Sequence, residues 1–174
     1  MGRWSAVVIF GGVLAQREAR AKTGPSKRGD FSKAHLEKSE FAYISPLDSR
    51  GAESTCHAEL WYAWLDGSVV VIVSSDGWKA RAVAKGRDRA RVWLGNHGRW
   101  KGWFGSRNEA FRQAPSFDAR VERIESDAKL DALLAVYETK YPAEIASWRD
   151  RMRSGFKDGS RVILRYRPTT TPTR

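Results

Sequence analysis

The sequence predicts a mainly β (α+β) fold, a small barrel of antiparallel strands with short helices and two packed C-terminal helices. Two observations lead to this prediction. From Phe41 onward most apolar residues fall in short runs separated by turn residues, which is typical of a strand meander. Apolar residues recur at helical spacing over several turns only after Ser126. Successive hairpins with few helices favour closure into a small barrel.

Six strands are expected along the chain. Residues 53–65 are predicted to form one long strand, which Asp66-Gly67 turns back onto residues 68–74 in a tight hairpin. The full set of expected strands is residues 40–45, 53–65, 68–74, 90–95, 116–124 and 160–168.

Three helices are expected between or after these strands. Residues 78–85 are predicted to form a short basic helix. Ser126 is expected to cap a second helix whose leucines and tyrosines share one face. Pro142 is expected to start the third helix and Gly155 to end it, because proline suits the first helical position and glycine the residue after the last turn.

The chain divides into three predicted segments. Residues 1–39 are interpreted as an N-terminal extension and linker, residues 40–168 as a single barrel domain, and residues 169–174 as a flexible tail. The apolar run at residues 6–15 is shorter than the roughly twenty residues of a membrane-spanning helix, so no membrane span is expected. A helical or disordered extension, or a start placed upstream of the true one, is favoured over a secretory signal, which predicts a cytoplasmic protein.

The charge of the chain is strongly basic and unevenly distributed. Lys and Arg number 31 against 20 Asp and Glu, a net charge of +11. Residues 78–123 alone hold 12 basic against 4 acidic side chains. Such a field attracts polyanions, but charge alone does not distinguish a phosphorylated cofactor from a nucleic acid or an acidic lipid surface. The single cysteine, Cys56, allows no internal disulfide.

The stretch SSDGWK, which follows the apolar run of residues 69–73, suggests a site for an anion. Ser74 and Ser75 offer hydroxyls, Gly77 permits a tight turn, and Lys79 adds a positive charge to the first turn of the expected helix, where backbone N–H groups lack helical partners. The alternative is a Ser/Asp/Gly turn that only caps a basic surface helix.

Common catalytic motifs are absent from the sequence. It contains no Cys-x-x-Cys, and its three histidines lack metal-ligand spacing, so no metal site is expected. A P-loop, a dinucleotide-binding G-x-G-x-x-G and a G-x-S-x-G nucleophile elbow are also missing. Each missing motif argues against a large class of enzymes.

Three segments between about Glu40 and Arg167 follow one another in a distinctive order: FAYIS, AELWYAWLDGSVVVIVSS and GWKARAVAKGRDRARVWLG. In this order of elements the chain resembles the flavin-binding split barrels of the pyridoxamine 5′-phosphate oxidase-like superfamily, including its deazaflavin-dependent branch. The resemblance implies that Ser74, Ser75 and Lys79 hold the phosphate of the cofactor.

Two departures from the family pattern concern the substrate. Trp78 stands where the pyridoxamine-oxidising members have an arginine, and the strand before the hairpin is neutral where they carry Arg and Lys. The chain is therefore more similar to the flavin or deazaflavin reductase branches, in which Trp61 or Trp64 would line the ring pocket or simply pack in the core. Trp78, Arg81 and Arg89 complete the candidate cofactor-binding residues, with a solvent-facing charge as the alternative for both arginines.

The resemblance implies a flavin- or deazaflavin-dependent oxidoreductase of unknown substrate. FMN is the expected cofactor and the deazaflavin coenzyme the alternative. No catalytic residue is assigned, because the hydride or electron pair comes from the flavin ring. The resemblance also implies a homodimer with the cofactor in a groove between two barrels, and eight tryptophans are more aromatic surface than one small core readily hides.

Two other classes of function are considered. A non-catalytic flavin-binding carrier or sensor would have the same barrel and bind the cofactor without turnover. A nucleic-acid-binding module is suggested by residues 87–107, where arginines and lysine interleave with Trp and Phe as in a platform for single strands. An ordinary half-buried strand accounts for the same pattern and is preferred, so nucleic acid is not the expected partner.

Overall fold

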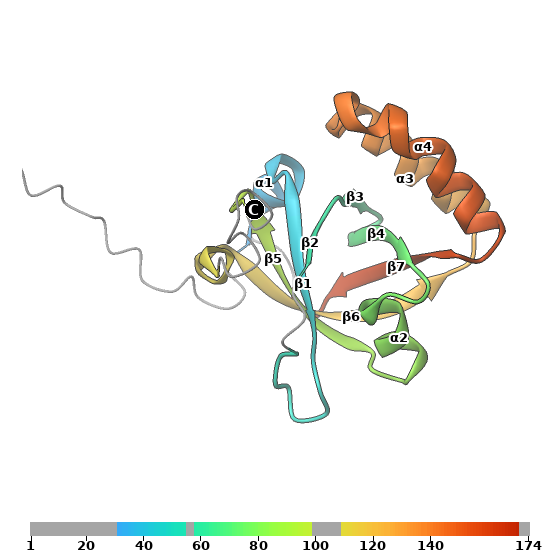
Figure 1. The fold of residues 1–174 in the computed structure, drawn as a ribbon. Helices are drawn as coiled ribbons and strands as arrows, with labels where there is room; N and C mark the ends of the chain where they lie inside the picture. Colours follow the sequence, from blue (N-terminus) through green and yellow to red (C-terminus); the bar gives the residue numbers. More distant parts are fainter. Residues whose placement is uncertain (1–30, 55–57, 99–108, 171–174) are drawn as a thin grey trace, which may run out of the picture.

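Seven antiparallel strands form one curled sheet with the order β2-β1-β5-β6-β7-β4-β3 (Figure 1). The computed structural model describes residues 31–54, 58–98 and 109–170. The predicted fold class, a mainly β (α+β) barrel with short helices and two packed C-terminal helices, is confirmed, and the sheet has the form of a curled antiparallel half-barrel. The elements are α1 (Lys33–Lys38), β1 (Phe41–Pro46), β2 (Ala58–Leu60), β3 (Ala63–Leu65), β4 (Ser68–Ser74), α2 (Trp78–Ala84), β5 (Arg89–Gly95), η2 (Ala110–Gln113), β6 (Ser116–Ile124), α3 (Asp127–Lys140), α4 (Pro142–Lys157) and β7 (Arg161–Pro168).

The strand expected at residues 53–65 is wrong as a single element. β2 pairs with β1 and β3 pairs with β4, so these two short strands form the two edges of the sheet. Only Trp61 and Tyr62 separate them in the chain. The apolar pattern is continuous because both strands pack against the core. The neighbouring strand changes from β1 to β4, however, and the sequence pattern does not indicate that change. The curl of the sheet therefore brings its edges together.

The other local predictions agree with the structure to within one residue at each strand end. Asp66 and Gly67 have φ angles of 48° and 69°, the left-handed conformations that a two-residue hairpin requires. Ser126 caps α3 by accepting a hydrogen bond from the N–H of Lys129 at 3.2 Å, and Pro142 is the first residue of α4. Gly155 does not end α4.

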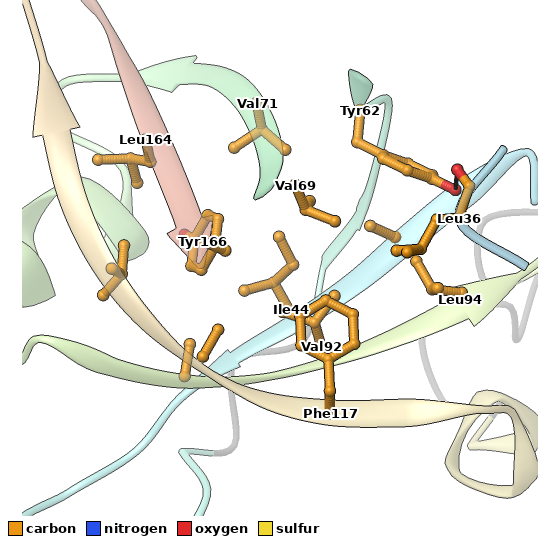
Figure 2. Packing of buried hydrophobic residues seen from close by; sticks show 14 of the residues in the cluster. Leu36, Ile44, Tyr62, Val69, Val71, Val92, Leu94, Phe117, Leu164 and Tyr166 are labelled. Atoms are coloured by element: carbon orange, nitrogen blue, oxygen red, sulfur yellow. Dashed lines mark hydrogen bonds between the residues drawn. The ribbon is translucent and has the colours of Figure 1, made fainter. Parts of the chain in front are cut away.

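The interior of the curled sheet is filled by buried side chains from β1, β4, β5, β6 and β7, and Leu60 of β2 and Trp64 of β3 pack at its margin (Figure 2). Residues alternate along β4, where Val69 and Val71 point inward while Val70 and Ile72 point outward. Helices α3 and α4 pack on each other and cover this outer face, as Figure 1 shows. The sheet is thus apolar on both faces around β4 and β7.

Short helices contribute to the interior at both ends. Ala80 and Val83 of α2 pack against the interior cluster, and so do Phe31 and Leu36 at the N-terminal side. The hydroxyl of Tyr62 donates a hydrogen bond to the carbonyl of Leu36 at 2.7 Å, drawn as a dashed line in Figure 2. The core therefore begins before residue 40, inside the segment predicted to be an extension and linker.

Several predictions of the sequence pattern fall outside the described residues. These are residues 1–30 with their apolar run, Cys56, the Trp-rich part of the 87–107 stretch, and the end of the C-terminal tail. In the part of the chain that the structure does describe, no helix is long and apolar enough to cross a membrane.

Candidate functional site at the junction of a polar turn and an aromatic pocket

The turn between β4 and α2 is held by two hydrogen bonds within the turn and one to the residue before β7. The hydroxyl of Ser74 donates to Oδ1 of Asp76 at 2.5 Å, and the N–H of Gly77 donates to the carbonyl of Ser74 at 3.1 Å. A Cβ at Gly77 would lie 3.0 Å from that carbonyl oxygen, so glycine permits the tight turn. The N–H of Ser75 donates to the carbonyl of Ser160 at 2.9 Å and ties the turn to the start of β7.

Helix α2 spans seven residues and points its charged side chains in different directions. Lys79 is only 5% exposed, and among the described residues it is the sole buried charged side chain. Trp78 is 41% exposed, and its indole N–H donates to the hydroxyl of Ser54 at 3.3 Å. Arg81 is exposed. Burying an ammonium is costly unless it is paired, and lysine is rarely buried in proteins, so the buried position of Lys79 is unusual for its residue type.

Arg89 lies apart from the serines and Lys79. It begins β5, at the far end of α2, where it lines a cavity of about 390 Å³ together with Lys85 and Arg87. A helix of seven residues is about 10 Å long, so α2 separates the two groups. Ser74 and Ser75 therefore lie where β4 runs into the turn and Lys79 at the start of α2, whereas Arg89 lies beyond the other end of this helix.

The two candidate tryptophans lie on opposite faces of the sheet. Trp61 packs against the outer cluster, where its ring stacks on Tyr141 with centroids 4.8 Å apart and meets the edge of Tyr137 at 5.8 Å. Trp64 packs against the interior cluster. Core packing, the alternative considered for both residues, accounts for Trp64, whereas Trp61 lines a cavity.

This cavity, here called the aromatic pocket, has a volume of about 350 Å³. It lies between β2, β4 and β7 on one side and α3 and α4 on the other. Most of its wall is aromatic or aliphatic, with one acidic and one basic residue. Its lining residues are Glu59, Leu60, Trp61, Ile72, Tyr137, Trp148, Met152 and Arg161.

The buried hydroxyl of Tyr137 connects the strands on two sides of this pocket. It donates to the carbonyl of Trp61 at 2.8 Å and hydrogen-bonds to the backbone of Ile72. Burial raises the pKa of Tyr137 well above its usual range, which keeps the phenol neutral and able to donate. Tyr141 acts in the same way one turn later, donating to the carbonyl of Glu40 at 2.6 Å and accepting from the N–H of Tyr62 at 3.1 Å.

The turn and the aromatic pocket adjoin at Arg161. This residue stands directly opposite Ser74 in the β4–β7 ladder, so the two side chains share the outer face of the sheet. Arg161 also lines the pocket. Sequence reasoning missed Tyr137, Trp148 and Arg161 as pocket residues. Tyr137 and Trp148 reach the pocket through the packing of α3 and α4, and Arg161 reaches it through the register of β7 against β4. No local sequence pattern indicates either arrangement.

The basic stretch at residues 87–107 is only partly described. Within the described part, the side chain of Arg91 is 11% exposed and forms ion pairs with Glu53 at 2.5 Å and Asp118 at 2.8 Å. One of the arginines that suggested a nucleic-acid platform is therefore engaged inside the protein. Across the described ranges, no three or more His, Cys, Asp or Glu side chains gather in a group that could hold a metal ion.

Comparison with known proteins identifies the fold. No family model matches the sequence, and no curated protein matches it either. HutZ, the heme storage protein from Vibrio cholerae, is similar in structure with a TM-score of 0.52 at 13% identity over 79% of this chain and 87% of HutZ. A conserved hypothetical protein from Mycobacterium tuberculosis gives a TM-score of 0.51 at 14% identity over 84% of this chain and 86% of its own.

A third structure, a protein of unknown function from Agrobacterium tumefaciens, gives a TM-score of 0.50 at 19% identity over 77% of this chain and 50% of its own. At these identities the likeness concerns the fold alone. The split-barrel fold implied by the family resemblance is confirmed.

Proposed function

We propose that this protein binds a flavin-type cofactor where the β4–α2 turn meets the aromatic pocket, and that it acts as an oxidoreductase. The observation that carries the proposal is the junction itself. Two serine hydroxyls lie in the turn and a buried lysine follows at the start of α2, while Ser74 stands opposite Arg161, which lines an aromatic cavity of about 350 Å³. A flavin cofactor has the matching shape, a flat ring joined through a ribityl chain to a phosphate.

The residues would divide the work as follows. Lys79, Ser74 and Ser75 hold the phosphate, for which Ser74 must release its hydrogen bond to Asp76. Trp61 lies along the ring, and the hydroxyl of Tyr137 holds the pocket wall in place. The bound cofactor supplies hydride or electron-pair transfer, while the protein contributes orientation and an environment from which water is excluded.

FMN is the proposed cofactor, with the deazaflavin coenzyme as the alternative, because both present a phosphate. We also propose a cytoplasmic homodimer with the cofactor between two barrels. Trp78 and Trp148, the exposed large hydrophobic residues of the described part, offer apolar contact area for a partner copy. Light scattering on the cofactor-loaded protein is expected to give a mass near twice 19.7 kDa. A strictly monomeric profile would count against the groove.

A carrier that binds without turnover is the second candidate. It is favoured by the likeness to HutZ, which is named as a heme storage protein. The two candidates differ in turnover. Steady-state oxidation of a reduced nicotinamide or reduced deazaflavin by the loaded protein is expected for an oxidoreductase, and its absence with every such donor would favour the carrier.

The cofactor itself is tested by mass spectrometry of the small molecules released from the purified protein, together with its visible absorption. We expect FMN or the deazaflavin coenzyme in about one copy per chain. A protein that releases neither molecule, and shows no spectral change when either is titrated in, would contradict the proposal.

A further inference from the structure

Arg161 is the first residue of β7 and places a positive charge at the aromatic pocket. Its guanidinium lies 5.6 Å from the centroid of the Trp148 ring, and both residues line the cavity. Arg151 lies over the same ring at the same distance of 5.6 Å but does not line the cavity. The two arginines thus make the same ring contact, and only one of them faces the pocket.

Gly155 of helix α4 leaves space for the side chain of Arg161. A Cβ at Gly155 would lie 2.9 Å from both Cγ and Cδ of Arg161, so this glycine leaves the space through which the side chain passes. Helix α4 continues to Lys157, and the left-handed residue beyond it is Gly159, with φ of 79°. Gly155 therefore provides a notch within the helix, not its end.

The notch directs the guanidinium toward the pocket. Trp148, Met152 and Gly155 lie on one stripe of α4, because residues three and four apart share a helix face. The stem of Arg161 crosses this stripe at Gly155, and its guanidinium reaches Trp148. The side chain therefore runs along α4 and past the wall of the pocket.

The charge of Arg161 is not neutralised by a neighbouring carboxylate of the described chain. Arg153 pairs with Asp131 and Arg165 pairs with Glu122, each at 2.6 Å, whereas Arg161 makes no ion pair in the described ranges. The acidic residue of the pocket, Glu59, accepts a hydrogen bond from the hydroxyl of Tyr43 at 2.6 Å. A guanidinium beside an aromatic cavity suits a planar ligand that carries an anionic group.

We infer that the aromatic pocket selects planar aromatic molecules with an anionic group, the ring lying against Trp61 and Trp148 and the anion facing Arg161. The inference rests on the proposed function only in sharing its pocket, and it requires neither a phosphate nor Lys79. The anion could belong to the cofactor or to an aromatic acid that is the substrate. Both present the same chemistry to Arg161.

The test uses two fluorescent probes with closely related ring systems. The first is 1-anilinonaphthalene-8-sulfonate, which is anionic, and the second is N-phenyl-1-naphthylamine, which is neutral. The full-length protein is expected to bind the anionic probe more tightly. Arg161→Met should weaken binding of the anionic probe about tenfold and binding of the neutral probe less than about twofold, since only the anionic group contacts the guanidinium.

Two further variants control for folding and for the contact with Trp148. Arg151→Met removes the matched guanidinium outside the pocket and should change the binding of both probes by less than about twofold. Gly155→Ala fills the notch and displaces Arg161, so it should weaken the binding of the anionic probe more than that of the neutral probe, and the melting temperature measures separately any loss of stability caused by the added Cβ. Thermal unfolding by circular dichroism checks each variant.

Three results would overturn the inference. The first is an equal loss of affinity for both probes in Arg161→Met, and the second is a loss of affinity for the anionic probe in Arg151→Met as large as that in Arg161→Met. The third is an unchanged affinity for the anionic probe in Gly155→Ala.

The source of the anion is identified by the effect of Arg161→Met on FMN binding, because FMN and the probe share the ring site and should compete in either case. A loss of FMN affinity comparable to that of the sulfonate assigns the anion to the cofactor, and an unchanged FMN affinity assigns it to a substrate. If neither FMN nor the deazaflavin coenzyme binds while the sulfonate still binds through Arg161, the proposed function fails and this inference stands.

Discussion

The two regions that meet at Arg161 are stabilised over very different distances in the chain. In the β4–α2 turn, the side chain of Ser74 bonds to Asp76, two positions away, and the distant contact of the turn, from Ser75 to Ser160, is made by backbone atoms. At the aromatic pocket, Tyr137 bonds to Trp61 across 76 positions and Tyr141 to Glu40 across 101. Changes in the turn should therefore alter ligand binding with little effect on the fold. Changes at the tyrosines should alter the stability of the whole sheet.

The largest expected effect is on the stability of the pocket wall. Tyr137→Ala removes a fully buried aromatic ring and should lower the free energy of unfolding by about 3–5 kcal/mol. Tyr137→Phe keeps the ring but leaves the carbonyl of Trp61 without its hydroxyl partner, for a smaller loss of about 1–3 kcal/mol. Urea unfolding measures both. A loss below about 1 kcal/mol for the alanine variant would show that the pocket tyrosines are no more important for the stability of the sheet than the residues of the turn.

The next effect concerns cofactor binding at the turn. Lys79→Ala should weaken FMN binding about ten- to a hundredfold, because a hydrogen bond to a charged group contributes roughly 1.5–3 kcal/mol. Lys85→Ala is the matched control at the far end of α2 and should change the dissociation constant less than about threefold. Both constants are measured at one ionic strength, since salt weakens any general attraction to a basic surface. Equal losses of FMN affinity in the two variants would show that SSDGWK only caps a surface helix and does not bind the phosphate.

A smaller effect separates the two faces of the sheet. Trp61→Leu should weaken FMN binding about three- to tenfold, as expected for the loss of one aromatic contact worth about 0.5–1.5 kcal/mol. Trp64→Leu should leave the dissociation constant unchanged and lower the unfolding midpoint in urea, because Trp64 packs against the interior cluster. The opposite pattern would place the ring of the cofactor on the other face.

The smallest expected effect is a pH dependence at the end of α3. Burial lowers the pKa of Lys140 to about 8, and its ammonium lies 3.4 Å from the centroid of the Tyr62 ring. The unfolded chain keeps its proton up to about pH 10.4, so between pH 8 and that value the unfolded state binds more protons and the stability supplied by this group rises with pH.

Lys140→Met isolates this contribution, because the titrating tyrosines are common to both proteins. The difference in unfolding free energy, wild type minus variant, should become more positive as the pH rises from 7 to 9.5 in a series of urea titrations. A flat difference would show that Lys140 keeps its ordinary pKa in the folded protein.

The same distinction explains which features could be predicted from the sequence. Asp66-Gly67 and the Ser126 cap act within a few residues, so their residue types are sufficient signals. The break at Trp61-Tyr62 depends on which strands lie alongside, and the role of Gly155 depends on a side chain from the next strand. Neither leaves a local trace, so a glycine near a helix end was predicted to end the helix.

The order of the strands also constrains how this chain can fold while it is being made. β7 is the last strand to be synthesised, yet it lies between β6 and β4 and is the element that joins the β2-β1-β5-β6 portion to the β4-β3 portion. Until residues 161–168 have left the ribosome, the inner valines of β4 lack their β7 neighbours. The earlier strands must remain unaggregated during this interval, so we expect the sheet to close only after β7 has emerged and this step to be sensitive to chaperones.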